Sequence, residues 1–120
     1  MKARDLKNIK PLVKIGHRKF YIQFNFNSMC VLEEVFPQGL NAAIRNMQTN
    51  KKVMSTLRAL IYSAIKPGYP SVTINEIGEL LSESFNKEDE WKEINEKIME
   101  ARQLFLPTDE QVDEVKEEGE

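Results

Sequence analysis

The chain has 120 residues, of which 41% are hydrophobic and 30% charged, and its formal net charge is −2. This is the size and composition of one globular domain with a small core. There is no run of about 20 apolar residues to span a membrane, and a single cysteine leaves no internal disulfide framework. The basic residues of the first 16 positions are followed by no apolar segment, so we expect no secretory signal. We therefore expect a cytoplasmic protein without membrane partners.

The first predicted element is a β-hairpin over about residues 12–24. Two runs rich in valine, isoleucine, phenylalanine and tyrosine flank the turn at 16–19, which contains a glycine. In the second run Phe20, Ile22 and Phe24 face the same side, because side chains alternate along a strand. A lone hairpin is marginally stable in water, so we expect this apolar face to pack on the helices that follow.

A predicted helix follows the hairpin without a loop. Asn25 and Asn27 are both good N-cap residues, because a side-chain oxygen can accept a hydrogen bond from a free N–H of the first turn. The helix is expected from residue 28 to residue 35 or 36, before Pro37 and Gly39 end it.

Two further helices are predicted over 40–47 and about 50–65, and the longer one carries the clearest apolar stripe of the chain. The segment 66–70 is rich in turn-forming residues and ends it. The helix after that opens with a capping box, in which Thr73 caps the first turn and Glu76 bonds back to the Thr73 N–H. We expect Gly78 within this helix to permit close packing against a neighbouring helix.

The last helix is predicted to begin after Asn86, with Trp91 in its apolar stripe, so that helices occupy about residues 26–105. The expected fold is α+β and mostly α: an N-terminal β-hairpin packs on a bundle of four to five helices. It forms a single globular domain over residues 1–108, and residues 109–120 form an acidic tail.

The predicted tail holds seven of the 19 acidic residues and one of the 17 basic residues, so residues 1–108 carry a net charge of +4. Val112 and Val115 are its only apolar side chains. A segment this polar cannot bury enough apolar surface to order itself, and we expect it to be disordered.

Neither the single histidine nor the single cysteine has the partners that catalysis or metal binding needs. His17 lies in a predicted turn with no acidic residue close in the sequence, which indicates a surface histidine. Cys30 lies on the apolar side of its predicted helix, where we expect a buried and inert thiol. The five glycines are scattered and form no phosphate-binding loop. We expect no enzymatic activity, no metal and no cofactor.

One segment allows a DNA-binding interpretation, because residues 71–84 look like the first helix of a helix-turn-helix. The next helix would then enter the major groove. Its first turn carries Glu88, Asp89 and Glu90, which DNA phosphates would repel. We therefore expect no nucleic-acid partner and attribute Thr73 and Glu76 to the capping box, but a small helix-turn-helix-like regulator stays the alternative function.

Two stretches in fixed order resemble the phage tail assembly chaperones, small proteins encoded upstream of the tape measure protein of long-tailed phages and prophages. In that family an aromatic-rich strand leads into a helix containing "LEE". A second signature, "LRxLLWAxL", is followed by a proline, a threonine cap and a glycine. The matching positions of the first signature are Phe24, Asn25, Phe26, Asn27, Ser28, Leu32, Glu33 and Glu34. Those of the second are Leu57, Arg58, Leu60, Ile61, Tyr62 (where tryptophan is common), Pro70, Val72, Thr73, Glu76, Ile77 and Gly78.

The resemblance extends over residues 14–105 and implies a non-enzymatic assembly factor of the host bacterial cytoplasm. Members of this family bind the tape measure protein and help to recruit tail tube protein, and the present chain resembles their short form. An apolar surface around Phe20, Ile22 and Phe24, or around Trp91, would be the expected place for such a partner. Self-association is compatible with this role.

Overall fold

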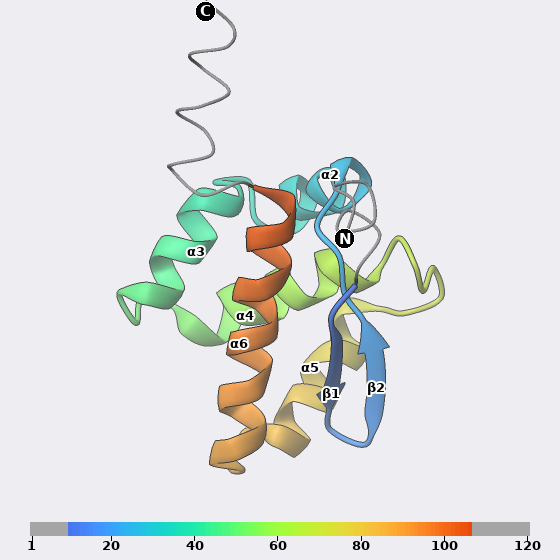
Figure 1. The fold of residues 1–120 in the computed structure, drawn as a ribbon, viewed down its shortest axis with the longest axis vertical. Helices are drawn as coiled ribbons and strands as arrows, with labels where there is room; N and C mark the ends of the chain where they lie inside the picture. Colours follow the sequence, from blue (N-terminus) through green and yellow to red (C-terminus); the bar gives the residue numbers. More distant parts are fainter. Residues whose placement is uncertain (1–9, 107–120) are drawn as a thin grey trace, which may run out of the picture.

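The computed structural model describes residues 10–106, which form a two-stranded antiparallel hairpin and five helices (Figure 1). The elements are β1 (Leu12–Ile15), β2 (Arg18–Tyr21), α2 (Phe26–Val35), α3 (Leu40–Gln48), α4 (Val53–Ile65), α5 (Ile74–Ser84) and α6 (Glu88–Phe105). This is the predicted α+β, mostly α, arrangement. The predicted acidic tail at 109–120 lies outside the described residues.

The hairpin turns at Gly16, whose φ of +62° is a left-handed conformation that glycine adopts without strain. A Cβ atom at Gly16 would also come within 2.8 Å of the Leu80 carbonyl oxygen, so the glycine lets the turn lie directly on α5. β2 is shorter than predicted. The Ile22 N–H still donates to the Pro11 carbonyl just before β1 (2.9 Å), but the Gln23 N–H donates to the Ala64 carbonyl of α4 (3.2 Å).

The side chains of the second strand alternate as predicted even where the regular pairing has ended. Phe20 and Ile22 are 0% exposed and Phe24 is 3% exposed, and all three belong to the main core. The expected packing of the hairpin on the helices is therefore confirmed.

Helix α2 starts two residues earlier than predicted because Asn25, not Asn27, is its N-cap. The Ser28 N–H donates to the Asn25 side-chain oxygen (2.9 Å), and the Asn25 N–H donates to the Ser28 hydroxyl oxygen (2.6 Å). Asn27 lies in the first turn of the helix with an exposed side chain. The capping box therefore forms around Ser28, the residue three positions after the cap.

The prediction that Cys30 is buried is wrong, because its thiol is exposed. The buried residues of α2 are Ser28 and Leu32, which lie one turn apart on the same side of the helix. Cys30 is two positions from each of them, and two positions on a helix correspond to about 200° of rotation. The side of α2 that packs on α4 therefore excludes Cys30.

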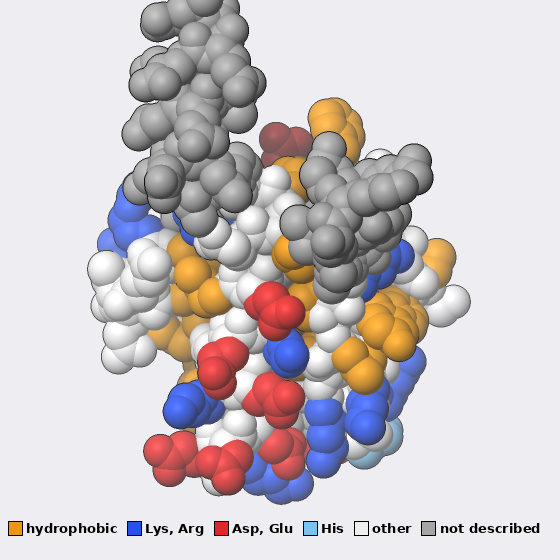
Figure 2. All heavy atoms as spheres, in the orientation of Figure 1, with side chains coloured by type: hydrophobic (Ala, Val, Ile, Leu, Met, Phe, Trp, Pro, Cys, Tyr) orange, Lys and Arg blue, Asp and Glu red, His pale blue; other side chains and the backbone are white. Residues whose placement is uncertain are grey.

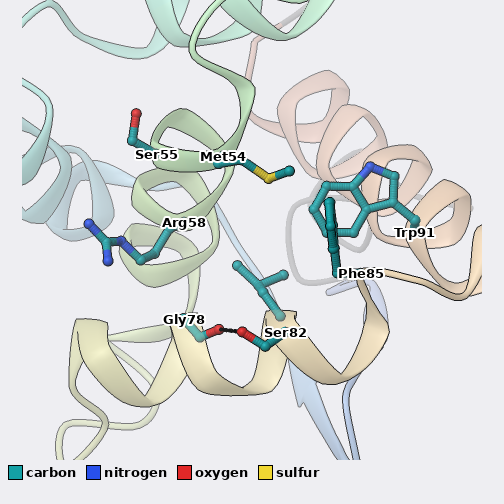
Figure 3. Close-up of a pocket in the computed structure, with 8 residues that line it drawn as sticks. Met54, Ser55, Arg58, Gly78, Ser82, Phe85 and Trp91 are labelled. Carbon is teal, nitrogen blue, oxygen red and sulfur yellow. Dashed lines mark hydrogen bonds between the residues drawn. The ribbon is translucent and has the colours of Figure 1, made fainter.

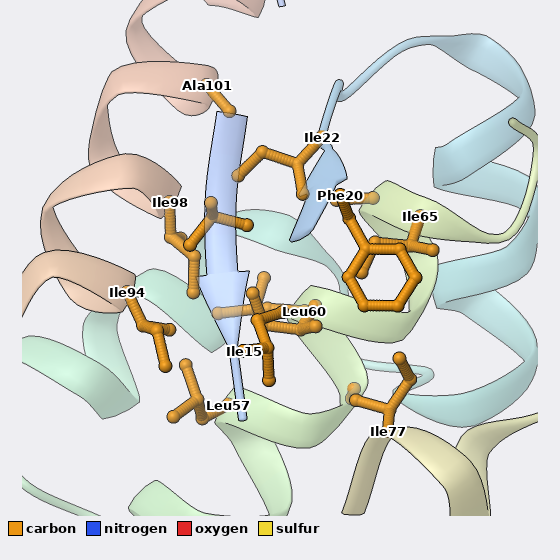
Figure 4. Close-up of a cluster of buried hydrophobic side chains, with 14 of the residues drawn as sticks. Ile15, Phe20, Ile22, Leu57, Leu60, Ile65, Ile77, Ile94, Ile98 and Ala101 are labelled. Atoms are coloured by element: carbon orange, nitrogen blue, oxygen red, sulfur yellow. The ribbon is translucent and has the colours of Figure 1, made fainter. Parts of the chain in front are cut away.

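Helix α4 lies at the centre of the described structure and contacts α2, α3 and α5. It begins at Val53, later than predicted, because Asn50 and Lys52 have left-handed backbone conformations that interrupt a right-handed helix (φ +57° and +48°). Helix α6 packs against β1. The core forms where these elements meet, with Leu57 and Leu60 of α4 close to Ile15 of β1 and Ile98 of α6 (Figure 4).

Helices α5 and α6 begin in two different ways. The predicted capping box of α5 is confirmed: the Glu76 N–H donates to Thr73 Oγ1 (3.1 Å), and the Thr73 N–H donates to Glu76 Oε1 (3.0 Å). Helix α6 follows Lys87 rather than Asn86, without a side-chain cap. Its first turn is acidic, and these charges complement the positive end of the helix dipole. No helix within residues 10–106 has the length and apolar character needed to cross a membrane.

Candidate functional site

An apolar groove opens where α4, α5 and the start of α6 meet, with a cavity volume of about 400 Å³ (Figure 3). Its lining residues are Met54, Ser55 and Arg58 from α4, Gly78, Leu81 and Ser82 from α5, Phe85 just after α5, and Trp91 from α6. We refer to these eight residues as the α4–α5–α6 groove.

The apolar end of the groove is built from three side chains that converge from three segments. Phe85 and Trp91 form an edge-to-face pair with ring centroids 5.4 Å apart and an interplanar angle of 78°. Met54 points toward this pair from α4 (Figure 3). Met54 is 55% exposed and Phe85 is 48% exposed, so a large part of their apolar surface faces solvent. An exposed cluster of this kind is typical of an interaction site.

The other end of the groove carries a positive charge. Arg58 is its only charged lining residue, and Figure 3 shows it at the far end from Trp91. The Arg58 side chain runs close over Gly78, where an added Cβ atom would lie 3.3 Å from Arg58 Cδ. The atoms nearest to Gly78 on α4 thus belong to the exposed Arg58 side chain and not to the helix backbone, so the predicted need for glycine in helix packing stays a prediction.

The polar groups of the groove differ in whether they have partners. The Ser82 hydroxyl donates to the Gly78 carbonyl (3.0 Å) and the Ser55 hydroxyl donates to the Lys52 carbonyl (3.4 Å). Arg58 forms no ion pair with any residue between 10 and 106, and its side chain is exposed. Within the described part of the chain, the groove thus offers a guanidinium without an ion-pair partner beside an apolar surface.

A hydrogen-bond network at the hairpin turn holds the two aromatic residues in place. The buried Ser84 hydroxyl accepts from the Gly16 N–H (2.8 Å) and donates to Glu90 Oε1 (2.8 Å). Ser84 precedes Phe85, and Glu90 precedes Trp91, so the network links β1 to both sides of the aromatic pair. The hydrogen bond from Ser84, helped by the charges of Lys14 and Lys87, lowers the pKa of the Glu90 carboxyl.

The histidine at the same turn has a partner that the sequence did not place beside it. His17 Nδ1 lies 2.9 Å from Glu83 Oε1, across 66 residues of sequence, and both side chains are exposed. The predicted surface position of His17 is confirmed, and its acidic partner comes from a residue far away in the sequence.

The structure separates the four apolar residues for which we considered partner binding. Phe20, Ile22 and Phe24 are buried in the core and expose at most 3% of their surface, so their burial argues against that assignment. Trp91 is half-buried and lines the groove. The capping residues Asn25, Thr73 and Glu76 lie at helix starts outside it, as does the exposed Asn27.

The sequence reasoning missed Met54, Arg58 and Phe85 as parts of a site. Met54 and Arg58 are four positions apart, which places them on the same side of a helix, beside the apolar stripe of α4. That spacing was the available signal. Phe85 is the C-cap of α5 and keeps a right-handed helical backbone, so its spacing of four from Leu81 was a comparable signal.

Residues 10–106 contain no group of three or more histidine, cysteine or acidic side chains placed to hold a metal ion. Comparison of the chain with protein-family models, with curated proteins and with solved structures gives no significant match.

Proposed function

We propose that the protein is a non-enzymatic tail assembly chaperone of a phage or prophage. In this role it binds a helical segment of the tape measure protein, keeps that protein soluble and helps to recruit tail tube protein. The observation that supports the proposal best is the exposed apolar surface of the α4–α5–α6 groove. A chaperone for an apolar helical client needs such a surface and needs no catalytic residues.

The positions that carry the family resemblance support the same proposal. The first signature lies at the junction of β2 and α2 and includes the capping box of Asn25 and Ser28. The second lies on α4 and α5, and two of its residues, Arg58 and Gly78, line the groove. The family resemblance therefore includes residues that line the exposed groove, which is compatible with a role in binding a partner.

Co-expression with fragments of the tape measure protein from the same phage or prophage tests this function. We expect fragments that are insoluble alone to become soluble and to co-purify with the chaperone. A small helical protein of similar acidity, expressed at the same level, is the control. Fragments that stay insoluble, and that do not co-purify after refolding together, would contradict the proposal.

The alternative of a helix-turn-helix-like regulator is disfavoured by the charge of α6. Its first turn carries Glu88, Asp89 and Glu90, and Figure 2 shows acidic side chains gathered over the face that α6 presents. DNA phosphates would be repelled by this helix. We expect no retention on duplex DNA at moderate salt, and specific retention there would favour the regulator instead.

A further inference from the structure

We propose that the α4–α5–α6 groove binds a helical peptide segment with apolar side chains on one face and a carboxylate beside them, and that Arg58 pairs with this carboxylate. The inference rests on the proposed function, because it assigns the client to one groove and to one chemistry. The partner could be recognised by its pattern alone: apolar anchors followed along the helix by an acidic residue.

The apolar end of the groove is suited to a side chain that inserts from outside. Its lining combines the buried Leu81 with the exposed Met54 and Phe85 and the half-buried Trp91. Tryptophan is among the residues that most often dominate binding energy at protein interfaces, where it fills a desolvated contact. Helix-in-groove complexes place apolar anchors three or four positions apart against such surfaces.

The charged end of the groove favours a negatively charged side chain on the partner. Arg58 is the only charged lining residue and has no carboxylate partner between residues 10 and 106. A guanidinium matches a carboxylate in geometry as well as in charge, because it can donate two parallel hydrogen bonds. An acidic residue on the incoming helix would therefore be favoured here, and a lysine at the same position would be disfavoured.

The two ends also give the site a direction. Met54, Phe85 and Trp91 lie together at one end in Figure 3, and Arg58 lies at the other, beyond Gly78. A helix bound along the groove must present its anchors and its carboxylate in matching order. A flat apolar patch would impose no such order, whereas this arrangement discriminates between sequences of similar hydrophobicity.

Trp91 makes the site directly measurable, because it is the only tryptophan of the chain. The probes are two designed amphipathic helices of about 20 residues without tryptophan. Both carry leucines at spacings of three and four. One has glutamates flanking the leucines and the other has lysines at the same positions. We expect the glutamate helix to change Trp91 emission on titration and to bind about fivefold or more tightly than the lysine helix.

Three variants of the full chain locate the effect. Arg58→Glu should reverse the preference, so that the lysine helix binds more tightly. Lys19→Glu changes the net charge equally from an exposed position outside the groove and should leave the preference unchanged. Met54→Glu places a charge at the apolar end and should weaken both helices by about tenfold. All three positions are exposed, so the variants should fold.

Four results would overturn the inference. Trp91 emission could stay unchanged with both helices, or the two helices could bind with equal affinity. The preference could persist in Arg58→Glu, or the protein could bind an apolar dye and neither of the two helices. Sedimentation of the same samples adds a fifth, since a dimer that Met54→Glu dissociates would assign the groove to a second copy. Co-expression with Arg58→Glu and Met54→Glu separates this inference from the proposed function. If both variants still solubilise the tape measure fragments, the chaperone function stands and the groove is not its site.

Discussion

Single side chains at the helix starts contribute to stability through hydrogen bonds that span only three residues. In α5 the exposed Thr73 and Glu76 satisfy two N–H groups that would otherwise lack a partner within the helix. The same motif opens α2 with Asn25 and Ser28. Both starts depend on residue identity at two positions that are three residues apart.

Thr73→Ala should lower the free energy of unfolding by about 1 kcal/mol, because the Glu76 N–H loses its acceptor. Urea denaturation followed by circular dichroism measures the change. Ser71→Ala, two residues earlier and also exposed, is the control and should stay within about 0.5 kcal/mol of the wild type. Equal stability of wild type and Thr73→Ala would contradict a stabilising cap.

Cys30 and Ser28 provide a matched pair on opposite sides of α2. The exposed Cys30 thiol should react fully and rapidly with a bulky thiol reagent in the native protein, and Cys30→Ser should change stability by less than about 0.5 kcal/mol. Ser28→Ala should cost about 1 kcal/mol, because Ser28 is buried and completes the capping box. Slow labelling that requires unfolding would mean that another surface covers Cys30 in solution.

At the scale of elements, the hairpin is attached to α5 and α6 through its turn. The Gly16 N–H is buried and donates to Ser84, which in turn donates to Glu90. Gly16 and Ser84 are 68 positions apart in the sequence. The position of the hairpin and that of the aromatic pair in the groove are therefore coupled.

Ser84→Ala should lower the free energy of unfolding by about 1–3 kcal/mol, because it leaves the buried Gly16 N–H without an acceptor. Ser82→Ala is the matched control, since Ser82 is exposed and bonds only within its own helix. Thermal and urea unfolding measure both. Loss of equal size in the two variants would indicate an effect of α5 helicity instead of the link to the hairpin.

The same network predicts a dependence of stability on pH. Because folding lowers the pKa of Glu90, the unfolded chain binds more protons as the pH falls, and the folded state loses this contribution. The contribution is complete above the ordinary carboxyl pKa of about 4.3 and disappears as the pH falls through the lower folded value. Ser84 is the largest cause of the shift, so Ser84→Ala should lose less stability than the wild type as the pH falls below the ordinary carboxyl pKa. Parallel curves would contradict this role.

At the scale of the whole molecule, the described fold is organised around α4, with the hairpin and α6 completing the core on one side and α5 forming the groove. The predicted acidic tail at 109–120 lies outside the described residues, so deletion of part of it is the direct test.

Deleting residues 111–120 should leave the melting temperature nearly unchanged. Burying Val112 and Val115 would contribute about 3–6 kcal/mol at most, whereas ordering ten residues costs about 15 kcal/mol. Differential scanning calorimetry of both chains makes the comparison. A decrease of several degrees would show that this segment packs on the body, and the prediction of a disordered tail would have to be abandoned.

The sequence by itself determined the class of fold and the order of the elements. It did so through two local signals, the alternation of apolar residues in the hairpin and the cap spacing at the start of a helix. Alternation placed Phe20, Ile22 and Phe24 on the buried side of the hairpin, and the Thr73–Glu76 spacing located the start of α5. These features could be predicted because their geometry repeats every two to four residues, within reach of neighbouring side chains.

Only the tertiary structure decided which apolar residues are covered and which stay open. Cys30 and Trp91 both follow an apolar pattern, yet one is exposed on α2 and the other lines a groove with Met54 and Arg58. The bonds of Gly16 and His17 join residues 68 and 66 positions apart. The side of a helix that is buried depends on the elements that pack against it, and those contacts form between segments whose separation in the chain leaves no local periodicity to reveal them.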